Sequence, residues 1–274
     1  MKNLTVLLSV IIFVVLISCH LDPGLEPTRS GIRGTIYFLN EWPEDTDQVL
    51  VVAATTFPPT GLADIVLGEP LPTFVDSTDY VLYTAPGTFA AVGVVWKEKG
   101  QPWDVTNIIG IYFPTEDHFT PGIVEVKNRN HMADSIDIVA DLSKAKRKVD
   151  STIEGMIRVV GEWPAGATSV LVAASNSLIP QGLLDIQFGM PIPAGFDSTT
   201  YVLSVQPGTY RLVGTLVLEQ DVPIGIQSVR GVYYRKPGDF LPGIVKVPSD
   251  TSHIKGIDIT IDFNKSPFPL LTGN

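Results

Sequence analysis

The chain has 274 residues, of which 45% are hydrophobic and 18% charged, so it is too apolar for a disordered protein and long enough for two domains of ordinary size. Its formal net charge of −10 argues against binding to nucleic acid or to anionic lipid, because both need a positively charged surface. Its 24 glycines and 22 prolines follow no short period, which indicates many turns between short strands.

The amino terminus has the features of a secretory signal. Lys2 supplies a positive charge, and residues 4–17 are almost wholly apolar. This run of about 14 residues is shorter than the roughly 18–20 that a membrane-spanning helix needs. It ends in Leu16-Ile17-Ser18-Cys19, where a small residue precedes the chain's single cysteine.

These four residues resemble the lipobox of bacterial lipoproteins. The resemblance implies that residues 1–18 are a signal peptide, that Cys19 is diacylated and begins the mature chain, and that residues 19–30 form a lipidated terminus and spacer. Two or more acyl chains anchor a protein stably, since each buried CH₂ contributes about 0.8 kcal/mol. A lipidated Cys19 also leaves no cysteine for a disulfide. An uncleaved signal-anchor with an incidental cysteine is the alternative.

The residue after Cys19 bears on location. In some bacteria, lipoproteins with aspartate at that position stay in the inner membrane, and here the position holds His20. The resemblance therefore implies a lipid-anchored protein of the outer membrane. Nothing in the sequence indicates whether the domains face the periplasm or the outside.

The chain repeats itself once. Residues 34–142 align without a gap to residues 155–263 at an offset of 121, and roughly two in five aligned positions are identical. Shared blocks include Glu-Trp-Pro, Asp-Ser-Thr and Pro-Gly-Thr. We therefore expect two tandem domains, 31–143 and 151–265, each with its own core.

Two segments lie outside the expected domains. Residues 144–150 are a basic linker in an acidic chain, which indicates a solvated connection; a docking site for an acidic partner is the alternative. Residues 266–274 form a proline-containing tail that we expect to lie across the second domain or to fray.

Within each repeat the apolar spacing is typical of strands. Ile32, Gly34, Ile36 and Phe38 alternate with polar neighbours, and residues 48–55 are nearly all apolar, as in a strand covered on both faces. The expected strands of the first repeat are 32–38, 48–55, 79–85, 88–97, 107–113, 122–126 and 135–142. Seven short antiparallel strands predict an all-β fold of two tandem Greek-key β-sandwiches. Residues 62–67 are expected to form one or two helical turns in a long loop.

A family resemblance is carried by one strand and the turn after it. The first repeat reads Tyr80-Val81-Leu82 and then Pro86-Gly87-Thr88-Phe89, and the second repeat has the same arrangement at 201–203 and 207–210. This pattern resembles the transthyretin-like sandwiches of the carboxypeptidase regulatory type. The resemblance implies non-catalytic domains that act as spacers, stabilisers or binding modules. Immunoglobulin-like topology is the alternative.

No catalytic motif is present. The sequence has no nucleophile elbow, no zinc-protease helix motif, no phosphate-binding loop and no dinucleotide fingerprint. None of its four histidines has a histidine at the matching position of the other repeat, which excludes a repeated histidine site. We therefore expect a protein that is not an enzyme and needs no cofactor, with an uncharacterised hydrolase as a remote alternative.

Several carboxylates occur in both repeats, among them Asp64/Asp185, Asp76/Asp197, Asp137/Asp258 and Asp141/Asp262. Calcium prefers such oxygen ligands, so Asp76, Asp79 and Asp197 are weak calcium candidates. No calcium-loop motif supports them. The favoured interpretation is that these side chains cap turns and solvate a strand face.

Aromatic residues are the other lead. Exposed rings stack on sugars or anchor a protein partner, so Trp96, Trp103, Tyr112 and Tyr233 are the candidate ligand-binding residues. Trp42 and Trp163 are expected instead to plug the ends of the sandwiches.

The sequence as a whole predicts a lipid-anchored cell-envelope protein that presents two non-catalytic modules for binding or structural spacing. The membrane, through the acyl chains on Cys19, and a glycan or an envelope protein are its expected partners. A carbohydrate-binding accessory protein that serves a glycan hydrolase or transporter is the alternative function.

Overall fold

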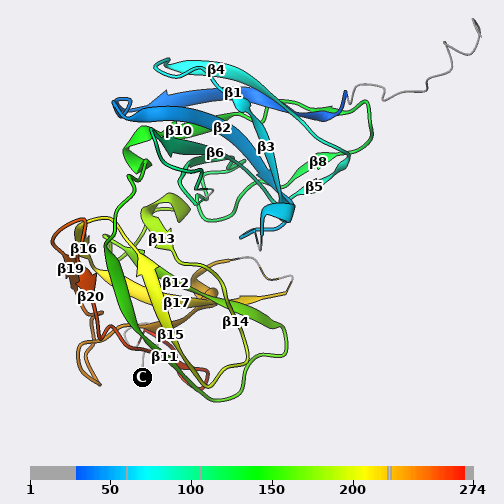
Figure 1. Cartoon of the computed structure of the whole chain (residues 1–274). Coiled ribbons are helices and arrows are strands. Elements are labelled where there is room, and N and C mark those ends of the chain that lie inside the picture. The colour runs from blue at the N-terminus through cyan, green and yellow to red at the C-terminus, as the bar shows by residue number, and fades with distance from the viewer. Residues whose placement is uncertain (1–28, 60, 105, 221, 223, 269–274) are drawn as a thin grey trace, which may run out of the picture.

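The computed structural model describes residues 29–59, 61–104, 106–220, 222 and 224–268 (Figure 1). This part of the chain is all-β: its only helices are four 3₁₀ turns of three residues each. None of the helices described is long and apolar enough to cross a membrane. The expected signal peptide, Cys19 and most of the spacer lie outside the described residues, as does the tail beyond residue 268.

The first repeat contains ten strands and two 3₁₀ turns among its described residues. They are β1 (Gly31–Leu39), β2 (Thr46–Ala54), η1 (Leu62–Asp64), β3 (Ile65–Pro70), β4 (Ser77–Tyr83), β5 (Gly87–Phe89), β6 (Ala91–Glu98), β7 (Ile108–Ile111), β8 (Val124–Val126), β9 (Met132–Ala133), β10 (Ile138–Asp141) and η2 (Leu142–Lys144). One sheet has the order β10-β1-β4, with β9 also on β1, and the other has the order β3-β2-β6-β7. Strands β5 and β8 form a separate ribbon.

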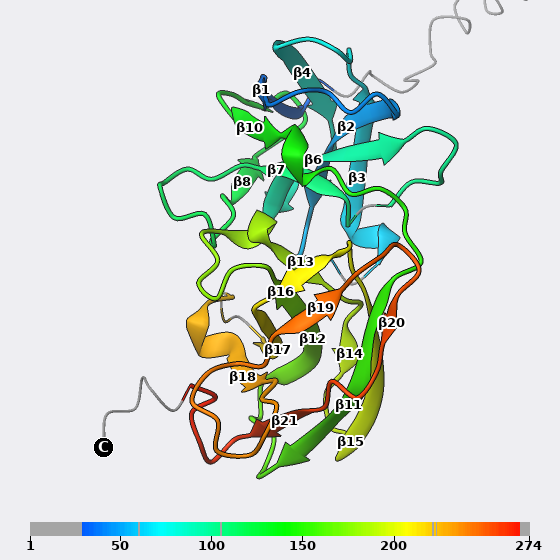
Figure 2. The ribbon, with the colours of Figure 1, turned by 90° about the vertical axis from the view of Figure 1, so that its left-hand side faces the viewer.

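The second repeat has the same plan. Its elements are β11 (Thr152–Val160), β12 (Ala167–Ser175), η3 (Leu183–Asp185), β13 (Ile186–Phe188), β14 (Ile192–Pro193), β15 (Ser198–Ser204), β16 (Gly208–Tyr210), β17 (Leu212–Glu219), η4 (Ile226–Ser228), β18 (Val229–Val232), β19 (Val245–Val247), β20 (His253–Ile254) and β21 (Ile259–Asp262). Strand β11 lies between β15 and the β20/β21 edge, and the second sheet runs β13-β12-β17-β18 with β14 on β12. Figures 1 and 2 show the two repeats as separate layered bodies joined by one linker.

Each repeat has its own apolar core. One cluster includes Ile36, Val51, Leu82 and Ile138 and takes all its members from the first repeat and the residues that follow it directly. The other includes Ile157, Val172, Leu203 and Ile259 and lies wholly in the second repeat. Burial of such side chains contributes about 1.5–3 kcal/mol each, so each repeat has the means to hold its own fold.

The strand patterns read from the sequence are confirmed where they are clearest. In β1, Ile32, Ile36 and Phe38 are buried while Arg33 and Tyr37 are exposed. Residues 49–54 of β2 are all buried, because both faces of its sheet are covered. The alternation along β1 and the continuous apolar run of β2 therefore reported the burial of each strand correctly.

Two features differ from the expectation. Residues 65–70 form strand β3, paired with β2, so the helical part of the predicted loop is only the 3₁₀ turn Leu62–Asp64. The first and last strands, β1 and β10, pair in parallel, so the sandwich is not wholly antiparallel. Side-chain periodicity records which face is buried but neither strand direction nor partner, and for this reason it could not show the parallel pairing.

The sheet order also bears on the family expectation. In the immunoglobulin arrangement the first two strands share a sheet. Here β1 lies beside β4 and β10, while β2 lies in the opposite sheet. Both repeats therefore depart from the immunoglobulin order.

A close approach between the first and last strands explains several shared residues. A side chain on Gly34 would place its Cβ 2.3 Å from the carbonyl oxygen of Ile136, which only glycine avoids. That same oxygen accepts a hydrogen bond from the Tyr80 hydroxyl at 2.8 Å, and burial raises the pKa of Tyr80. The Asp137 carboxylate accepts from the Thr35 amide at 2.8 Å. The second repeat keeps the whole arrangement at the matching positions, so the shared aspartate has a structural role.

Candidate functional site

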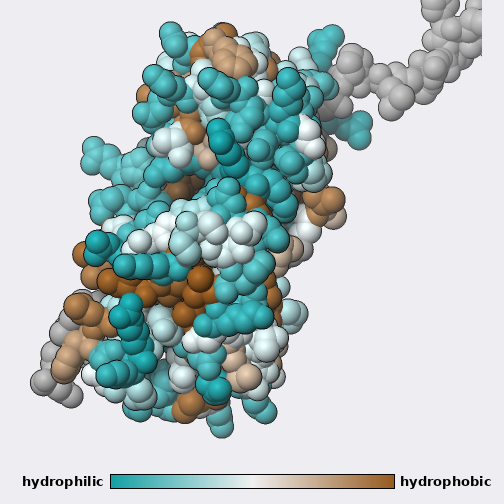
Figure 3. Space-filling view, turned by 60° about the vertical axis from the view of Figure 1, so that its left-hand side comes forward, coloured by the Kyte–Doolittle hydropathy of each residue, from teal (hydrophilic) through white to brown (hydrophobic). Residues whose placement is uncertain are grey.

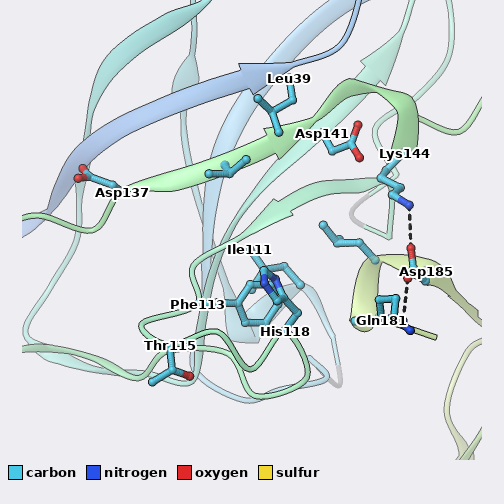
Figure 4. A pocket seen from close by; sticks show the side chains of 13 residues that line it. Leu39, Ile111, Phe113, Thr115, His118, Asp137, Asp141, Lys144, Gln181 and Asp185 are labelled. Atoms are coloured by element: carbon cyan, nitrogen blue, oxygen red, sulfur yellow. Dashed lines mark hydrogen bonds and ion pairs between the residues drawn. The ribbon is translucent and has the colours of Figure 1, made fainter. Parts of the chain in front are cut away.

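A cleft lies where the repeats meet. It has a volume of about 420 Å³ and takes walls from both repeats (Figure 4). The first repeat contributes Leu39, Ile111, Phe113, Thr115, His118, Asp137, Val139 and Asp141, the linker contributes Lys144, and the second repeat contributes Gln181, Gly182, Leu184 and Asp185. Its mixed apolar and charged lining is that of an interface between packed modules.

A short turn of the second repeat forms one wall and docks on the first. In the turn of residues 182–185, the Leu183 amide donates to the His118 carbonyl oxygen at 3.0 Å. A Cβ on Gly182 would lie 2.7 Å from the Cβ of His118, so the two backbones meet closely. Leu183 itself is only 4% exposed. The turn is therefore a packed contact between the repeats and not a solvated loop.

An ion pair closes the cleft beside this turn. Lys144 Nζ lies 2.7 Å from Asp185 Oδ1 (Figure 4), and both side chains are about a third exposed. Partial burial alone would raise the pKa of Asp185, but hydrogen bonds from Lys144 and from the Gln181 amide hold it below its ordinary value. Asp185 is therefore ionised at neutral pH and ties the turn to the end of the first repeat.

The basic linker of residues 144–150, which is half-buried or exposed throughout, makes specific contacts with the rest of the chain. Arg147 Nε lies 2.9 Å from Asp45 Oδ2, and the Lys148 amide donates to Glu98. The Asn107 side chain exchanges two hydrogen bonds with the backbone of Lys146, at 2.7 and 2.9 Å. Burial lowers the pKa of Lys146. Two of the basic side chains, Lys144 and Arg147, therefore pair with carboxylates elsewhere in the chain, which a linear reading of charge could not show.

The other ionisable groups of the cleft also hold structure. Asp141 accepts from the Ser143 amide at 2.9 Å and from Asn40, so it caps η2. The rings of His118 and Phe113 lie 5.2 Å apart, in a tilted contact. Within the described residues no nucleophile–base hydrogen bond is recorded among the cleft's side chains. The charged groups named here cap η2 and tie the turn of the second repeat to the end of the first.

The structure corrects one of the four aromatic candidates, Trp96, and places Tyr112 and Tyr233 half-buried. Trp96 is fully buried in the first core, and its indole N–H donates to Thr46 Oγ1 at 2.8 Å, so it takes no part in an exposed patch. Tyr112 and Tyr233 are the members of their pairs that pack against the two cores. Their neighbours are engaged elsewhere: Phe113 lines the cleft beside His118, and the Tyr234 hydroxyl donates to the Pro267 carbonyl oxygen at 2.7 Å.

Trp103 is the remaining aromatic candidate. Its ring is 36% exposed, and Lys97 Nζ lies 5.9 Å from the ring centre. A cation at that distance over a ring contributes about 0.5–1 kcal/mol at an exposed site. Trp103 therefore stands as a single exposed ring without Trp96 beside it.

Trp42 and Trp163 lie as predicted. Each is half-buried against its core, and each indole N–H donates to a backbone carbonyl, that of Val75 at 3.0 Å and that of Phe196 at 3.1 Å. Tryptophan is well suited to such a place, because one side of the ring is apolar and the N–H needs a partner.

Of the weak calcium candidates, Asp79 uses its carboxylate within the sheet, while Asp76 and Asp197 join it through their backbones. Asp79 Oδ1 accepts from the Thr35 hydroxyl at 2.8 Å across β1 and β4. The backbone oxygens of Asp76 and Asp197 accept from strands β1 and β11. Among the described residues, no group of three or more His, Cys, Asp or Glu side chains is placed to hold a metal ion.

Sequence reasoning missed the residues that join the repeats, namely Leu183, Lys144 and His118. A signal was present: Gly-Leu-x-Asp occurs at 61–64 and again at 182–185, and Asp64/Asp185 was noted as a shared carboxylate. The repeat shows that the turn is shared, but not that one copy of it would be covered.

No known family model matches the chain, and no curated protein matches it. Among solved structures, the TIE protein of Bacillus anthracis aligns at 11% identity and a TM-score of 0.18, over 85% of this chain and 34% of that one. A candidate adhesin from Bacteroides ovatus aligns at 8% identity and a TM-score of 0.22, over 85% and 87% of the two chains. The major pilin of Streptococcus pyogenes aligns at 10% identity and a TM-score of 0.16, over 86% and 98%. Overlaps this low carry no argument about function.

Proposed function

We propose that this chain is a lipid-anchored cell-envelope protein that presents two non-catalytic β-sandwich modules for binding or structural spacing. The observation that carries the proposal is the join between the repeats. The docked turn at 182–185, the Lys144–Asp185 pair and the linker contacts all hold the modules against one another. The polar groups of the cleft, among them Lys144 and Asp185, bond to one another and so hold the two repeats together.

A joined pair of sandwiches is suited to spacing. Flexible linkers leave domains free to move, and relative motion is the default unless the interface is substantial. Here the linker backbone is bonded to Asn107 on one side and to Gln206 on the other, at 2.8 Å for the latter. The pair therefore extends as a unit from its amino-terminal attachment.

The membrane attachment rests on the Leu16-Ile17-Ser18-Cys19 sequence after an apolar run. Cys19→Ser should abolish incorporation of labelled palmitate and move the protein out of the membrane fraction. His20→Ala, one residue further on, is the matched control and should keep both properties. Equal membrane association of the Cys19→Ser variant, with no palmitate label on either chain, would falsify lipid anchoring.

The family and location are part of the same proposal. Departure from the immunoglobulin sheet order supports the transthyretin-like assignment, and His20 after the cysteine supports the outer membrane. Protease treatment of intact cells, with lysed cells as control, tests on which side the modules lie. Digestion of intact cells places them outside, and protection until lysis places them in the periplasm.

Carbohydrate capture is a second candidate, favoured by the exposed ring of Trp103 in a loop of the first repeat. Stacking of such a ring on a sugar would make Trp103→Ala abolish retention on polysaccharide. Val81→Ala, at another exposed apolar position of the first repeat, is the control. Unchanged retention of the Trp103→Ala variant would exclude this role for the ring.

A further inference from the structure

The cleft between the repeats has the size and the lining of a small-molecule site. Its volume of about 420 Å³ lies within the range of about 300–1,000 Å³ that such sites occupy, and they form preferentially where modules meet. Two of its apolar side chains, Leu39 and Val139, lie on neighbouring strands and are 50% and 52% exposed. Apolar surface alone does not single out a site, since apolar side chains also gather in a band across the second repeat (Figure 3). What distinguishes the cleft is that carboxylates lie beside this apolar surface without the basic partners that their counterparts in the second repeat have.

The first of these carboxylates is Asp137, which comes directly before β10. The matching residue of the second repeat, Asp258, accepts from a backbone amide through Oδ1 and pairs through Oδ2 with Arg158 Nη1 at 3.3 Å. Asp137 keeps only the amide contact, from Thr35. Tyr37 occupies the position of Arg158 in the first repeat, and within the described residues Asp137 has no ion pair. Asp137 therefore brings an unbalanced negative charge to the cleft.

The second carboxylate is Asp141, at the other end of β10. Its counterpart in the second repeat, Asp262, pairs with Lys265 at 3.3 Å. The lysine at the matching position of the first repeat, Lys144, pairs instead with Asp185 of the second repeat at 2.7 Å. This end of the cleft therefore holds two carboxylates and one ammonium group, which leaves one negative charge in excess.

The strand holds the two charges a fixed distance apart. Asp137 and Asp141 lie at opposite ends of β10 (Figure 4), and four residues of a strand span about 13 Å. Because side chains alternate along a strand, both carboxylates share the outward face with Val139, which lies midway between them. Leu39, opposite Asp141 on β1, widens this apolar stretch. The two charges are too far apart to bind one metal ion together, and no cluster suited to a metal ion occurs among the described residues.

We propose that the cleft binds a chain-like organic dication, an aliphatic diamine or polyamine with one ammonium group at each carboxylate and its methylene chain along Val139 and Leu39. Hydrogen bonds between ammonium and carboxylate groups are about twice as strong as those between neutral groups, and burial of the methylene chain adds a hydrophobic contribution. A compact cation would reach only one of the two carboxylates and would leave the apolar stretch uncovered. The site depends neither on lipid anchoring nor on the ring of Trp103.

Isothermal titration calorimetry of the full chain in a non-ionic detergent, with decamethylenediamine as the probe, tests the proposal. One molecule is expected to bind per chain. Putrescine carries the same charge on a shorter chain and should bind roughly tenfold more weakly, because it cannot span both carboxylates. Asp137→Asn should weaken binding of the long diamine about tenfold, since a charge-assisted hydrogen bond is lost while the amide oxygen still accepts from Thr35. Asp258→Asn removes the same charge from the second repeat and should change the affinity by less than about twofold, because exposed charges far from the ligand are screened.

A second pair of variants copies each repeat onto the other. Tyr37→Arg supplies Asp137 with the cation that Asp258 has, and it should lower the affinity for the long diamine about tenfold. Arg158→Tyr, the reverse change in the second repeat, should leave the affinity unchanged. Midpoints of thermal unfolding show that the four variants fold. The proposal is overturned if the long diamine does not bind, if the two diamines bind equally, or if Asp258→Asn weakens binding as much as Asp137→Asn, since that last result would mean that the diamine responds only to the net charge of the chain.

Discussion

The two repeats share a turn of the same sequence and the same backbone, and they differ in what covers it. Leu183 is buried because the first repeat lies against it, while Leu62, at the matching position, faces solvent. Asp185 in the docked turn binds Lys144, which follows the first repeat. The comparison teaches that a local sequence can determine the shape of a turn completely while its burial depends on which module is next to it.

A second difference concerns backbone strain. The two repeats adopt left-handed backbone at three matching positions, where the second has Gly161, Gly195 and Gly256. The first repeat holds Asn40, Phe74 and Ser135 there, with φ of 69°, 59° and 61°. Left-handed backbone costs a residue with a side chain about 1–2 kcal/mol. The shared fold, and not local preference, therefore imposes these angles on the first repeat.

The largest expected effect contrasts the two cores. Trp96 fills the first core where the second has Val217, and its partner Thr46 is matched by Ala167. Trp96→Ala should lower the free energy of unfolding by about 3–5 kcal/mol, because it leaves a large cavity. Urea unfolding followed by circular dichroism measures this loss.

A double variant sharpens the Trp96 contrast. Trp96→Val with Thr46→Ala copies the second repeat and should cost less than Trp96→Ala, since it fills part of the cavity and removes the hydroxyl that loses its donor. A loss below about 1 kcal/mol for Trp96→Ala would mean that the indole is not a core residue.

The next largest effect is a difference in stability between substitutions in the 182–185 turn and in the 61–64 turn. Leu183→Ala should destabilise the protein by about 2–3 kcal/mol, at the low end for a buried leucine because the turn can relax. Leu62→Ala should change stability by less than about 0.5 kcal/mol, as at other exposed sites. Thermal unfolding of the two variants side by side is the measurement. Equal losses in both would show that the first turn is as well covered as the second.

Acidification should release the docked turn. The pKa of Asp185 is lowered in the folded chain, so the stability it contributes is present above the pKa of the unfolded chain and is lost as the pH falls through the folded value. At neutral pH, Asp185→Asn should cost up to about 1 kcal/mol, since the pair is partly exposed.

Hydrogen exchange at the Leu183 amide reports this release directly. The difference between the native chain and Asp185→Asn should begin to shrink as the pH falls below about 4 and should vanish once the pH is below the lowered pKa of the folded chain, where the carboxylate is protonated in both states. A difference that stayed constant down to pH ~2 would assign the effect to packing and not to charge.

The smallest effect tests the strain. Ser135→Gly should stabilise the first repeat by about 0.5–1 kcal/mol, because relief of the left-handed backbone outweighs the added freedom of the unfolded chain. Gly256→Ser should destabilise the second repeat by a similar amount. Midpoints of thermal unfolding give both values, and a loss of stability in the Ser135→Gly variant would show that its side chain is needed at that position.

By itself, the sequence determined the internal repeat, the all-β class and the buried face of the clearest strands. These properties follow from periodicity within a segment: the alternation along β1 and the apolar run of β2 both record local burial. The sequence also predicted that Trp42 and Trp163 pack against their cores, because both follow a glutamate and precede a proline at matching positions of the two repeats.

Only the tertiary structure decided which shared residues became contacts. The burial of Trp96, the parallel pairing of β1 with β10 and the docking of Leu183 all join segments remote from one another in the chain. The charged side chains of Lys144 and Arg147 in the linker likewise pair with Asp185 and Asp45. The physical reason is that periodicity encodes how one segment meets solvent, whereas partners and strand directions are set by how distant segments pack together.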